Sequence, residues 1–447
     1  MTSTQPARGM RDFLPDDVRR RDYVVDIVRE VYDRYGFEPI ETPAAENIET
    51  LLGKYGEEGG KLVFKILKRG EHEASGQADL ALRYDLTVPF ARIVAEYQAV
   101  LPKIFKRYQI QPVWRAERPA RGRFREFYQC DIDAIGSTSP MVEAEQIGAV
   151  AEVLDRLTFQ DFTIVLNHRG VLTGLLDASE IAPERREPAL VALDKLDKIG
   201  EQAVEADLVT RGVAPSQAAR LMEVLRTITG HSGNEQRLQE LHRLLDETPH
   251  RGAVENLGAI VRLVAATPAA ARVAIDPRLA RGLSYYTGAI MEITVPDLPG
   301  SLGGGGRYDN LIGMFLGSDV PACGFSLGLE RIVVVMQERG MFPAAASQSA
   351  VDVVVAAIDE SAQTAALELA STLRRSAGVR VDLYPDVAKK MDRIFKYVDQ
   401  RKARFIAVLG SDEVAAGTVT LRNVAQKTRD TMPRADVASF IQTTGKT

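Results

Sequence analysis

The chain has 447 residues and a formal net charge of −5, with 45% hydrophobic and 26% charged residues. These proportions are ordinary for a globular protein, and about three domains are expected at this length. The mild acidity argues against a protein that coats nucleic acid or an anionic membrane through its overall charge, but it leaves room for a local basic site.

Cysteine and histidine usage narrows the class further. Two cysteines, Cys130 and Cys323, rule out a disulfide framework and fit a reducing cytoplasm. The five histidines are scattered without zinc-ligand spacing, so no metal-binding residue is predicted. The N-terminus has no apolar signal segment, and no apolar run approaches the roughly 20 residues of a membrane span. We therefore expect a cytoplasmic protein with no membrane segment.

The first part of the chain predicts alternating helices and strands. Apolar residues at helical spacing predict a helix over 16–36, and Gly36 is its expected C-cap. A second helix is predicted over 141–157. Strands are predicted over 37–43, 62–67, 80–87, 104–117, 123–135 and 161–167.

The strand over 80–87 has a polar face. Alternation places Arg83, Asp85 and Thr87 on that face, and Thr87 is the expected cap of a helix over 88–97. These three residues suit a binding site, but an ordinary polar strand face explains them equally well.

Between 170 and 260 the pattern becomes almost wholly helical, which predicts an inserted helical module. Strand signals return over 285–295, followed by a Gly-rich turn at 300–311 and a strand that runs into a helix over 323–340. The GGGG at 303–306 lacks the Lys-Ser/Thr of a phosphate-binding loop. We expect it to approach a ligand or a neighbouring strand closely, or to form a plain hairpin turn.

A low-complexity segment over 341–350 predicts a domain boundary. After it, strands and helices alternate, which is typical of an α/β domain with a partly parallel sheet. The predicted divisions are a core in two parts (1–169 and 261–340), a helical insertion (170–260), a linker (341–350) and a C-terminal α/β domain (351–447).

The strands over 104–117 and 123–135 are joined by an arginine-rich loop. Paired as a hairpin, they would place on one floor Arg115, Glu117, Phe127, Gln129 and Asp133. Guanidinium forks suit phosphate oxygens, an aromatic face can stack on a base, and a carboxylate can accept from an amine. The floor therefore suits a nucleotide beside a small amine. The alternative is an exposed hairpin whose charges serve solubility.

These residues carry a resemblance. VWRAERPARGRFREF resembles the signature hairpin of class II aminoacyl-tRNA synthetases, and GFSLGLERI resembles their closing strand–helix element. YGFEPIETP resembles the opening element, which normally helps to form the dimer interface. RGLSYYTG and GGGRYDNL resemble two elements peculiar to histidyl-tRNA synthetases, and LRYDLTVPFAR and RGMRDFLP fit the same family. The resemblance spans nearly the whole chain, with the motifs in the expected order.

The resemblance implies an α+β fold: a class II synthetase core with a mostly antiparallel sheet flanked by helices, a helical insertion and a C-terminal α/β anticodon-binding domain. It implies that histidine attacks the α-phosphate of ATP to give histidyl-adenylate, and that the histidyl group then passes to the 3' end of histidine tRNA. The implied cosubstrate is ATP with Mg²⁺. The implied partners are L-histidine, histidine tRNA and a second copy of the chain in a homodimer.

The resemblance also implies residue roles. Arg281 and Arg115 would stabilise charge at the α-phosphate. The histidine-binding set is Asp85, Thr87, Gln129, Asp133, Tyr285, Tyr286 and Tyr308. The ATP-binding set is Arg115, Glu117, Arg123, Phe127 and Arg331.

Within the histidine set, Asp85 and Thr87 would take the α-amino group, while Asp133 and Tyr286 would contact the imidazole nitrogens. One of Tyr285 and Tyr286 is also explained as aromatic strand filler, and Tyr286 is the expected ligand. Within the ATP set, Glu117 would meet the adenine amine, Phe127 would stack on the ring, and two arginines would hold the outer phosphates, Arg123 and Arg331.

Two alternatives remain open. A non-catalytic paralogue, such as the regulatory subunit of ATP phosphoribosyltransferase, typically lacks the C-terminal domain and the catalytic arginines. An RNA-binding protein could use the hairpin without chemistry. Ser284 stands where the family usually has Asp, and its effect stays open. A basic run suits either a solvated helix face or an anticodon contact: Lys389, Lys390, Arg393, Lys396, Arg401, Lys402 and Arg404.

Overall fold

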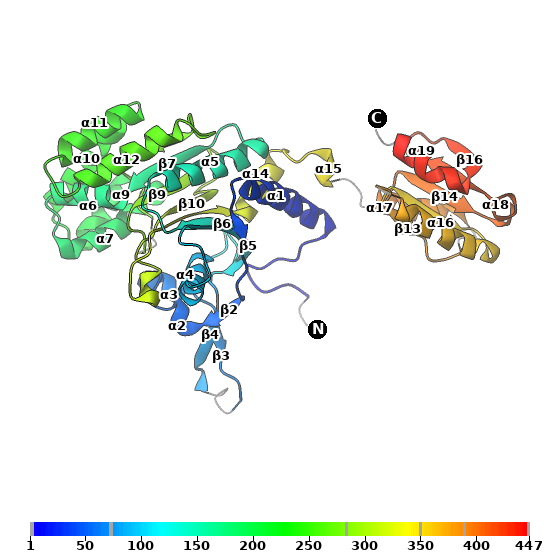
Figure 1. Ribbon diagram of the computed structural model, residues 1–447, viewed down its shortest axis with the longest axis horizontal. Helices are drawn as coiled ribbons and strands as arrows, with labels where there is room; N and C mark the ends of the chain where they lie inside the picture. The colour runs from blue at the N-terminus through cyan, green and yellow to red at the C-terminus, as the bar shows by residue number, and fades with distance from the viewer. Residues whose placement is uncertain are drawn as a thin grey trace. The chain divides into compact units, whose positions relative to one another are not determined.

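The computed structural model describes residues 4–70, 75–281, 285–347, 351–376, 378–387 and 390–444. The chain forms two compact units, Met1–Phe342 and Pro343–Thr447, each with its own hydrophobic core (Figure 1). Two residues singled out above, Ser284 and Lys389, lie outside the described residues. Within the described ranges, no helix is both long enough and apolar enough to cross a membrane.

A large mixed sheet forms the centre of the first unit. Its strand order in the described part of the chain is β1-β5-β6-β11-β10-β9-β7-β8, with parallel pairing at β1/β5 and β7/β8 and antiparallel pairing elsewhere. The predicted α+β fold with a mostly antiparallel sheet flanked by helices is thereby confirmed. The strands are β1 (Glu38–Pro39), β5 (Phe105–Trp114), β6 (Glu126–Ile135), β7 (Thr163–His168), β8 (Val273–Ile275), β9 (Ala289–Thr294), β10 (Gly303–Arg307) and β11 (Ala322–Gly328).

Helices pack on one face of this sheet and on one another: α1 (Pro15–Arg34), α5 (Met141–Arg156) and α14 (Leu329–Glu338). In α1 the buried Val24, Val28 and Val31 recur at helical spacing and supply the face that packs. Helix α1 ends at Arg34, and Gly36 then turns the chain with a φ of +73°.

Strand β6 separates the core from the polar face of the sheet. Cys130 and Ile132 are fully buried in the hydrophobic core. Gln129, Asp131 and Asp133 alternate with them and line a cavity. The period of two in the sequence thus places an apolar surface against the helices and a row of polar side chains opposite.

The prediction for residues 80–97 needs two corrections. Strand β4 (Ala78–Leu82) ends before Arg83, and α4 (Thr87–Glu96) already begins at Thr87. The buried Arg83 guanidinium donates to the carbonyls of Thr42 at 2.6 Å and Pro112 at 2.8 Å, which draws the chain out of the strand. The expected Thr87 cap is wrong, because the carboxylate that accepts from the first turn of α4 belongs to Asp85.

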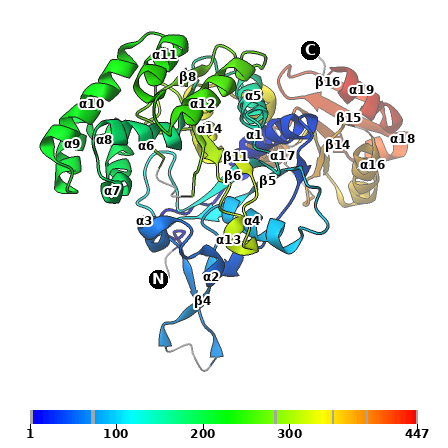
Figure 2. The same ribbon diagram turned by 60° about the vertical axis from the view of Figure 1, so that its left-hand side comes forward.

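Strand β4 belongs to a small sheet of order β2-β4-β3. This sheet extends away from the large sheet in both ribbon views (Figures 1 and 2). Its strands and neighbouring helices are β2 (Ala45–Asn47), β3 (Lys65–Leu67), α2 (Ile48–Leu51) and α3 (Gly56–Lys61).

The sequence predicted a turn in the Gly-rich segment, but residues 303–307 form strand β10 inside the large sheet. A side chain at Gly303 would lie 2.5 Å from the Ser326 carbonyl, and one at Gly305 would collide with the Gly324 carbonyl. The glycines therefore allow β11 to approach closely, which is the close approach that the sequence predicted. After β10 the chain forms a short helix, α13 (Gly313–Leu316).

A helical module follows β7 and returns to the sheet at β8, and both ribbon views show it gathered at one end of the first unit. Pro183 and Pro215 each stand at the start of a helix, where a missing N–H costs nothing. The helices are α6 (Arg169–Ala178), α7 (Pro183–Leu193), α8 (Leu196–Ile199), α9 (Glu201–Thr210), α10 (Pro215–Gly230), α11 (Asn234–Leu245) and α12 (Arg251–Val264).

The second unit begins with α15 (Ala344–Ser347), inside the segment predicted as a linker. Its sheet has the order β13-β12-β14-β15-β16, parallel across β13, β12 and β14 and antiparallel beyond. The elements are β12 (Val353–Ala357), α16 (Gln363–Arg375), β13 (Val381–Leu383), α17 (Met391–Arg401), β14 (Phe405–Leu409), α18 (Ser411–Ala416), β15 (Thr418–Asn423), β16 (Arg429–Pro433) and α19 (Val437–Thr444).

Helices cover both faces of this second sheet. Val353 and Val355 pack in one cluster with α16 and α19, and Val354 and Ala356 pack in another with α17. The continuous apolar run of β12 reflects burial on both faces.

Candidate active site

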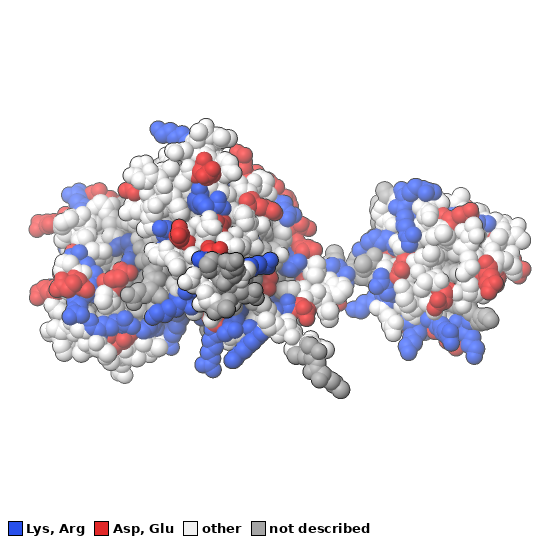
Figure 3. Space-filling view, turned by 90° about the horizontal axis from the view of Figure 1, so that it is seen from below, with Lys and Arg blue, Asp and Glu red and all other residues white. Residues whose placement is uncertain are grey.

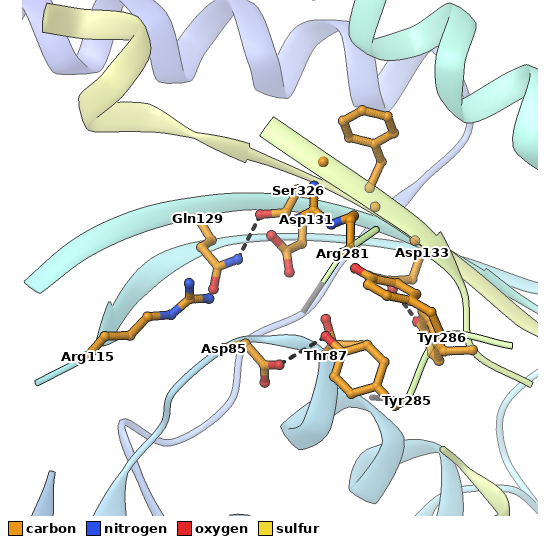
Figure 4. Close-up of a pocket in the computed structure, with 15 residues that line it drawn as sticks. Asp85, Thr87, Arg115, Gln129, Asp131, Asp133, Arg281, Tyr285, Tyr286 and Ser326 are labelled. Atoms are coloured by element: carbon orange, nitrogen blue, oxygen red, sulfur yellow. Dashed lines mark hydrogen bonds between the residues drawn. The ribbon is translucent and has the colours of Figure 1, made fainter. Parts of the chain in front are cut away.

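A cavity opens on the polar face of the large sheet (Figure 4). Its walls come from β6, β10 and β11, from the start of α4, and from residues on either side of 282–284. The predicted residues that line it are Asp85, Thr87, Arg115, Gln129, Asp133, Arg281, Tyr285, Tyr286 and Tyr308. The predicted residues outside its lining are Glu117, Arg123, Phe127 and Arg331.

Asp85 is held by three donors. Its Oδ1 accepts from the Tyr55 hydroxyl at 3.0 Å and from the Val88 backbone N–H at 3.1 Å. Its Oδ2 accepts from the Tyr285 hydroxyl at 3.3 Å. Burial raises the pKa of Asp85, and these donors and Arg115 oppose that rise. Tyr285 therefore has a defined partner and is more than strand filler.

Asp133 occupies the other end of the cavity. Its Oδ2 lies 2.7 Å from Nη2 of the buried Arg107, and its Oδ1 accepts from the Tyr308 hydroxyl. Burial raises the pKa of Asp133, while Arg107 and the Tyr308 hydroxyl lower it. The Tyr285 ring lies 4.9 Å from that of Tyr286 and 6.0 Å from that of Tyr308, centroid to centroid.

Three polar residues at this end had no role predicted from the sequence, although Asp131 belongs to the same polar strand face as Gln129 and Asp133. Arg107 is completely buried, Asp131 is 2% exposed, and Ser326 accepts from Gln129 Nε2 at 2.8 Å. A signal for Arg107 was present, because Arg107, Gln109 and Gln111 alternate along β5 as Gln129, Asp131 and Asp133 do along β6.

Arg281 reaches the cavity from beside the helical module. Its Nη1 donates to Glu292 Oε2 at 3.0 Å and to the Met291 carbonyl at 3.2 Å, and its buried Nε has no hydrogen-bond partner in the described part of the chain. A Cβ at Gly304 would collide with this guanidinium. Gly304 thus makes room for the arginine rather than for a phosphate loop.

In Figure 4, Arg115 lies at the end of the row of labelled residues away from Asp133 and Tyr286. Its Nε donates to the Tyr84 carbonyl at 3.1 Å, and its guanidinium carbon lies 4.4 Å from the Tyr84 ring centroid and 5.1 Å from that of Phe127. Cation–π contacts on the two rings orient the guanidinium. Through Phe127, Arg115 connects the cavity to the ATP set.

The rest of the ATP set lies on the loop between β5 and β6 and at the start of α14. Glu117 Oε2 and Arg123 Nε are 3.5 Å apart. Burial lowers the pKa of Arg331, and repulsion from Arg123 lowers it further, while Glu292 and Glu117 oppose that shift. Two guanidiniums that repel one another favour an anion with several charges.

The N-terminal segment holds this loop. Gly9 accepts from the Arg125 backbone N–H at 2.8 Å, and the Arg125 Nε donates to the Glu117 carbonyl at 3.0 Å. The Arg11 guanidinium lies 3.6 Å from the Phe124 ring centroid. These contacts replace the strand ladder, so residues 115–125 are a loop although the sequence predicted strand at both ends.

Glu330, from the GFSLGLERI segment, is buried against the start of β6. Its Oε2 accepts from the Tyr128 backbone N–H at 2.8 Å. Burial raises its pKa to about 7, opposed by that hydrogen bond and by Arg11 and Arg21. The glutamate of this motif thus supports the edge of the floor, while the next residue, Arg331, belongs to the ATP set.

Two family models match the chain. The model described as Histidyl-tRNA synthetase matches residues 9–332, and an anticodon binding domain matches residues 352–444. The chain is 41% identical over 459 residues to the histidine–tRNA ligase of Gloeobacter violaceus, covering 97% of each chain. It is 40% identical over 453 residues to that of Porphyromonas gingivalis, covering 97% of this chain and 98% of the relative.

Solved structures agree with these matches. The crystal structure of histidyl-tRNA synthetase from Nostoc sp. PCC 7120 has a TM-score of 0.80 and 29% identity, and the match covers 99% of this chain and 100% of that one. A Bacillus halodurans structure described as an ATP phosphoribosyltransferase regulatory subunit/histidyl-tRNA synthetase shares the fold, with a TM-score of 0.73 at 22% identity. The family model spans the residues that line the cavity. The chain therefore belongs to the histidyl-tRNA synthetase family.

Proposed function

We propose that the protein is a histidine–tRNA ligase, which activates L-histidine with ATP and transfers the histidyl group to the 3' end of histidine tRNA. The observation that carries the proposal is that Arg115, Arg281 and Asp133, far apart in sequence, line one cavity. Relatives with 40% and 41% identity over nearly their whole length bear the name histidine–tRNA ligase.

The amino acid would lie along the polar row of β6. Asp133, Tyr286 and Tyr308 would surround the imidazole, and Asp85 and Thr87 would receive the α-amino group. A pocket of hydrogen-bonding groups rejects apolar amino acids strongly, because their binding would leave buried polar atoms unpaired. The burial of Asp85 and Asp133, at 2% and 1% exposure, supports this role.

The nucleotide would lie against the loop and the start of α14. Phe127 would stack on adenine, Glu117 would accept from its amine, and Arg123 and Arg331 would hold the outer phosphates. The mutual repulsion of these two arginines supports this assignment, because a triphosphate would relieve it.

The first step needs no protein nucleophile. A carboxylate oxygen of histidine attacks the α-phosphorus, the bond from that phosphorus to the bridging oxygen breaks, and pyrophosphate leaves with its electron pair. In the second step a ribose hydroxyl of the tRNA attacks the histidyl carbonyl, loses its proton and releases AMP. Arg115 and Arg281 would stabilise the charge that builds on the phosphorus in the first step.

We propose that ATP binds as its Mg²⁺ complex. Glu117 and Glu292 both lie within electrostatic reach of Arg331, and one or two carboxylates with phosphate oxygens are the ligands that Mg²⁺ prefers. The described residues contain no group of three or more His, Cys, Asp or Glu side chains arranged for a metal ion. The ion would screen the phosphate charges as pyrophosphate leaves.

A regulatory paralogue is the weaker alternative. Such a paralogue typically lacks the C-terminal domain and the catalytic arginines. Here Arg115, Arg281 and Arg331 are present, and a second unit with its own core spans Pro343–Thr447. The similarity to the Bacillus halodurans structure extends to the fold alone.

The tRNA would contact more than one region. Lys390, just before α17, and Arg393 and Lys396 on it are exposed, whereas Ile394 and Val398 are buried. The three basic side chains are therefore able to meet a tRNA backbone. Figure 3 shows Lys and Arg side chains along one edge of the helical module, with Asp and Glu beside them. We propose that the second unit binds the anticodon and the helical module the acceptor arm.

We further propose a homodimer in the cytoplasm. The opening motif that ends at Pro43 supports dimerisation through its resemblance, and both cysteines are free and buried, as suits a reducing compartment. Sedimentation should give about twice the chain mass of 49.0 kDa. A monomer at micromolar concentration would contradict the dimer.

The deciding experiment is histidine-dependent ATP–pyrophosphate exchange followed by charging of histidine tRNA. Both reactions are expected with the full-length protein. Charging of histidine tRNA, with no charging of other tRNAs, would support the substrate assignment. Folded protein that binds ATP but shows no exchange with histidine would rule out the ligase and favour the paralogue or RNA-binding alternative.

A further inference from the structure

A third buried carboxylate lies on the cavity floor, beyond those assigned to histidine. Asp131 stands between Gln129 and Asp133 on the polar face of β6 and is 2% exposed. Figure 4 shows its carboxylate pointing into the space that Asp85 and Tyr285 bound on the opposite side. The resemblance assigned this residue no role.

The other two carboxylates already have donors. Asp85 accepts from two tyrosine hydroxyls and a backbone N–H, and Asp133 pairs with Arg107 and Tyr308. Buried carboxylates are normally satisfied in this way, because an unpaired buried charge is costly.

Asp131 differs from them. Its Oδ1 is buried and has neither a hydrogen-bond partner nor an ion-pair partner among the described residues, whereas Asp133 Oδ2, which also lacks a hydrogen bond, lies 2.7 Å from Arg107 Nη2. The opposite residue on β5 is Gln109, whose amide nitrogen donates to Thr42 Oγ1 at 3.0 Å and to Gln111 Oε1 at 2.6 Å instead.

The charged side chains around Asp131 do not neutralise its carboxylate either. The neighbouring Arg107 is committed to Asp133 at 2.7 Å, and Asp85 adds further negative charge. Burial raises the pKa of Asp131 to about 7, Arg107 and a hydrogen bond with the Ser326 side chain oppose the rise, and Asp133 and Asp85 add to it. A cation from outside the chain would stabilise the ionised form.

A second unpartnered acceptor lies beside it. Gln129 Nε2 donates to Ser326, but Gln129 Oε1 is buried without a partner in the described part of the chain. Together with Asp85 across the cavity, these atoms provide three acceptors around one space. A primary ammonium group carries three N–H donors and stays charged at neutral pH.

We propose that Asp131 is a specificity residue that binds the α-ammonium group of the amino acid substrate, jointly with Gln129 and Asp85. This inference rests on the proposed function. It assigns the charge of the α-amino subsite to Asp131, since Asp85 is largely satisfied within the chain, and it leaves the imidazole to Asp133 and its tyrosines.

The test is isothermal calorimetry on the full-length protein with two ligands. L-Histidine carries the α-amino group, and 3-(imidazol-4-yl)propionate is the same molecule without it. In Asp131→Asn, L-histidine should bind about ten- to hundredfold more weakly, the effect of losing a hydrogen bond to a charged group. The propionate should bind within about threefold of its wild-type affinity. Asp161→Asn, at an exposed position, is the matched control and should change neither.

The outcomes distinguish a failure of the proposed function from a failure of the inference about Asp131. Wild-type protein that does not bind L-histidine would sink the proposed function itself. Wild-type binding that Asp131→Asn leaves unchanged would overturn only the inference. So would equal weakening of both ligands, because that result points to the imidazole or to general support of the pocket.

Two further measurements guard against a folding artefact. In Asp131→Asn the side chain can still accept from Ser326 but loses a buried charge whose Oδ1 has no hydrogen-bond partner in the described part of the chain, so its melting temperature at pH 8 should equal or exceed that of wild type, whereas a purely structural residue would lower it. At pH 7, titrations of L-histidine in buffers of different ionisation enthalpy should show more proton release with wild-type protein than with Asp131→Asn, since Asp131 ionises on binding. Equal release by the two proteins would count against the inference.

Discussion

The cavity and the proposed nucleotide region beside it are built differently. At the proposed histidine end, Asp85, Asp131 and Asp133 stand at the start of a helix and on a central strand and are at most 2% exposed. At the proposed nucleotide end, the side chains of Arg123 and Glu117 are 42% and 23% exposed and stand on a loop. The contrast indicates that selectivity for a small amino acid depends on buried polar groups, whereas a triphosphate can be held by charges near the surface.

Arg281 lines the cavity and is proposed to act at the α-phosphate, where histidine and ATP react, so its loss should affect the use of both substrates. Arg281→Ala should lower the rate of ATP–pyrophosphate exchange by about a hundred- to a thousandfold, as expected when a charge-stabilising donor is removed. The dimer should persist. Arg278→Ala, at a neighbouring partly exposed arginine, is the control. Exchange near the wild-type rate in Arg281→Ala would remove its assigned role.

Asp133 tests the buried end alone. Asp133→Asn keeps the shape of the side chain but removes the charge that faces Arg107. The KM for histidine in the exchange reaction should rise about ten- to hundredfold, and the KM for ATP should change little. A variant in which ATP affinity suffers and histidine affinity does not would show that the imidazole assignment is wrong.

Phe127 tests the exposed end. Phe127→Ala removes the proposed stacking surface, so the KM for ATP should rise about tenfold with little change in the KM for histidine. Phe127→Tyr keeps the ring and should stay close to wild type. If the two variants behave alike, adenine does not stack on this residue.

Glu330 tests whether the loop end also depends on a buried group. Its pKa of about 7 in the folded protein lies above the ordinary glutamate value, so the folded state holds the extra proton between these values. The contribution of this carboxyl to the free energy of unfolding is therefore fully present below about pH 4. It is lost as the pH rises through 7, at up to about 1.4 kcal/mol per pH unit.

Glu330→Gln should flatten that decline, because glutamine still accepts from the Tyr128 N–H but does not titrate. Urea unfolding midpoints between pH 5 and 8 measure the slope. The exposed Glu247→Gln should leave the slope unchanged. Parallel slopes for wild type and Glu330→Gln would mean that this carboxyl is not titrating in the range.

Much of this molecule follows from local pattern. The period of two along β6 predicts which residues face the cavity, and helical spacing predicts α1 and α5 to within a few residues. The sequence motifs named above identify the family, because they occur in the expected order along nearly the whole chain. The roles of the site residues and the domain boundaries stay predictions.

Other features depend on neighbours distant in sequence. The end of β4 is decided by Arg83, whose hydrogen bonds reach Thr42 and Pro112, and the Gly-rich segment becomes a strand because β9 and β11 flank it. No local pattern contains those partners.

By itself, the sequence determined the family, the fold class and the polar face of the floor, because periodicity and ordered motifs are properties of the chain read in one dimension. Only the tertiary structure decided that Asp131 Oδ1 has no hydrogen-bond or ion-pair partner among the described residues. That depends on where Arg107, Gln109 and the tyrosines find their partners, and satisfaction of a buried charge is settled in space rather than along the chain.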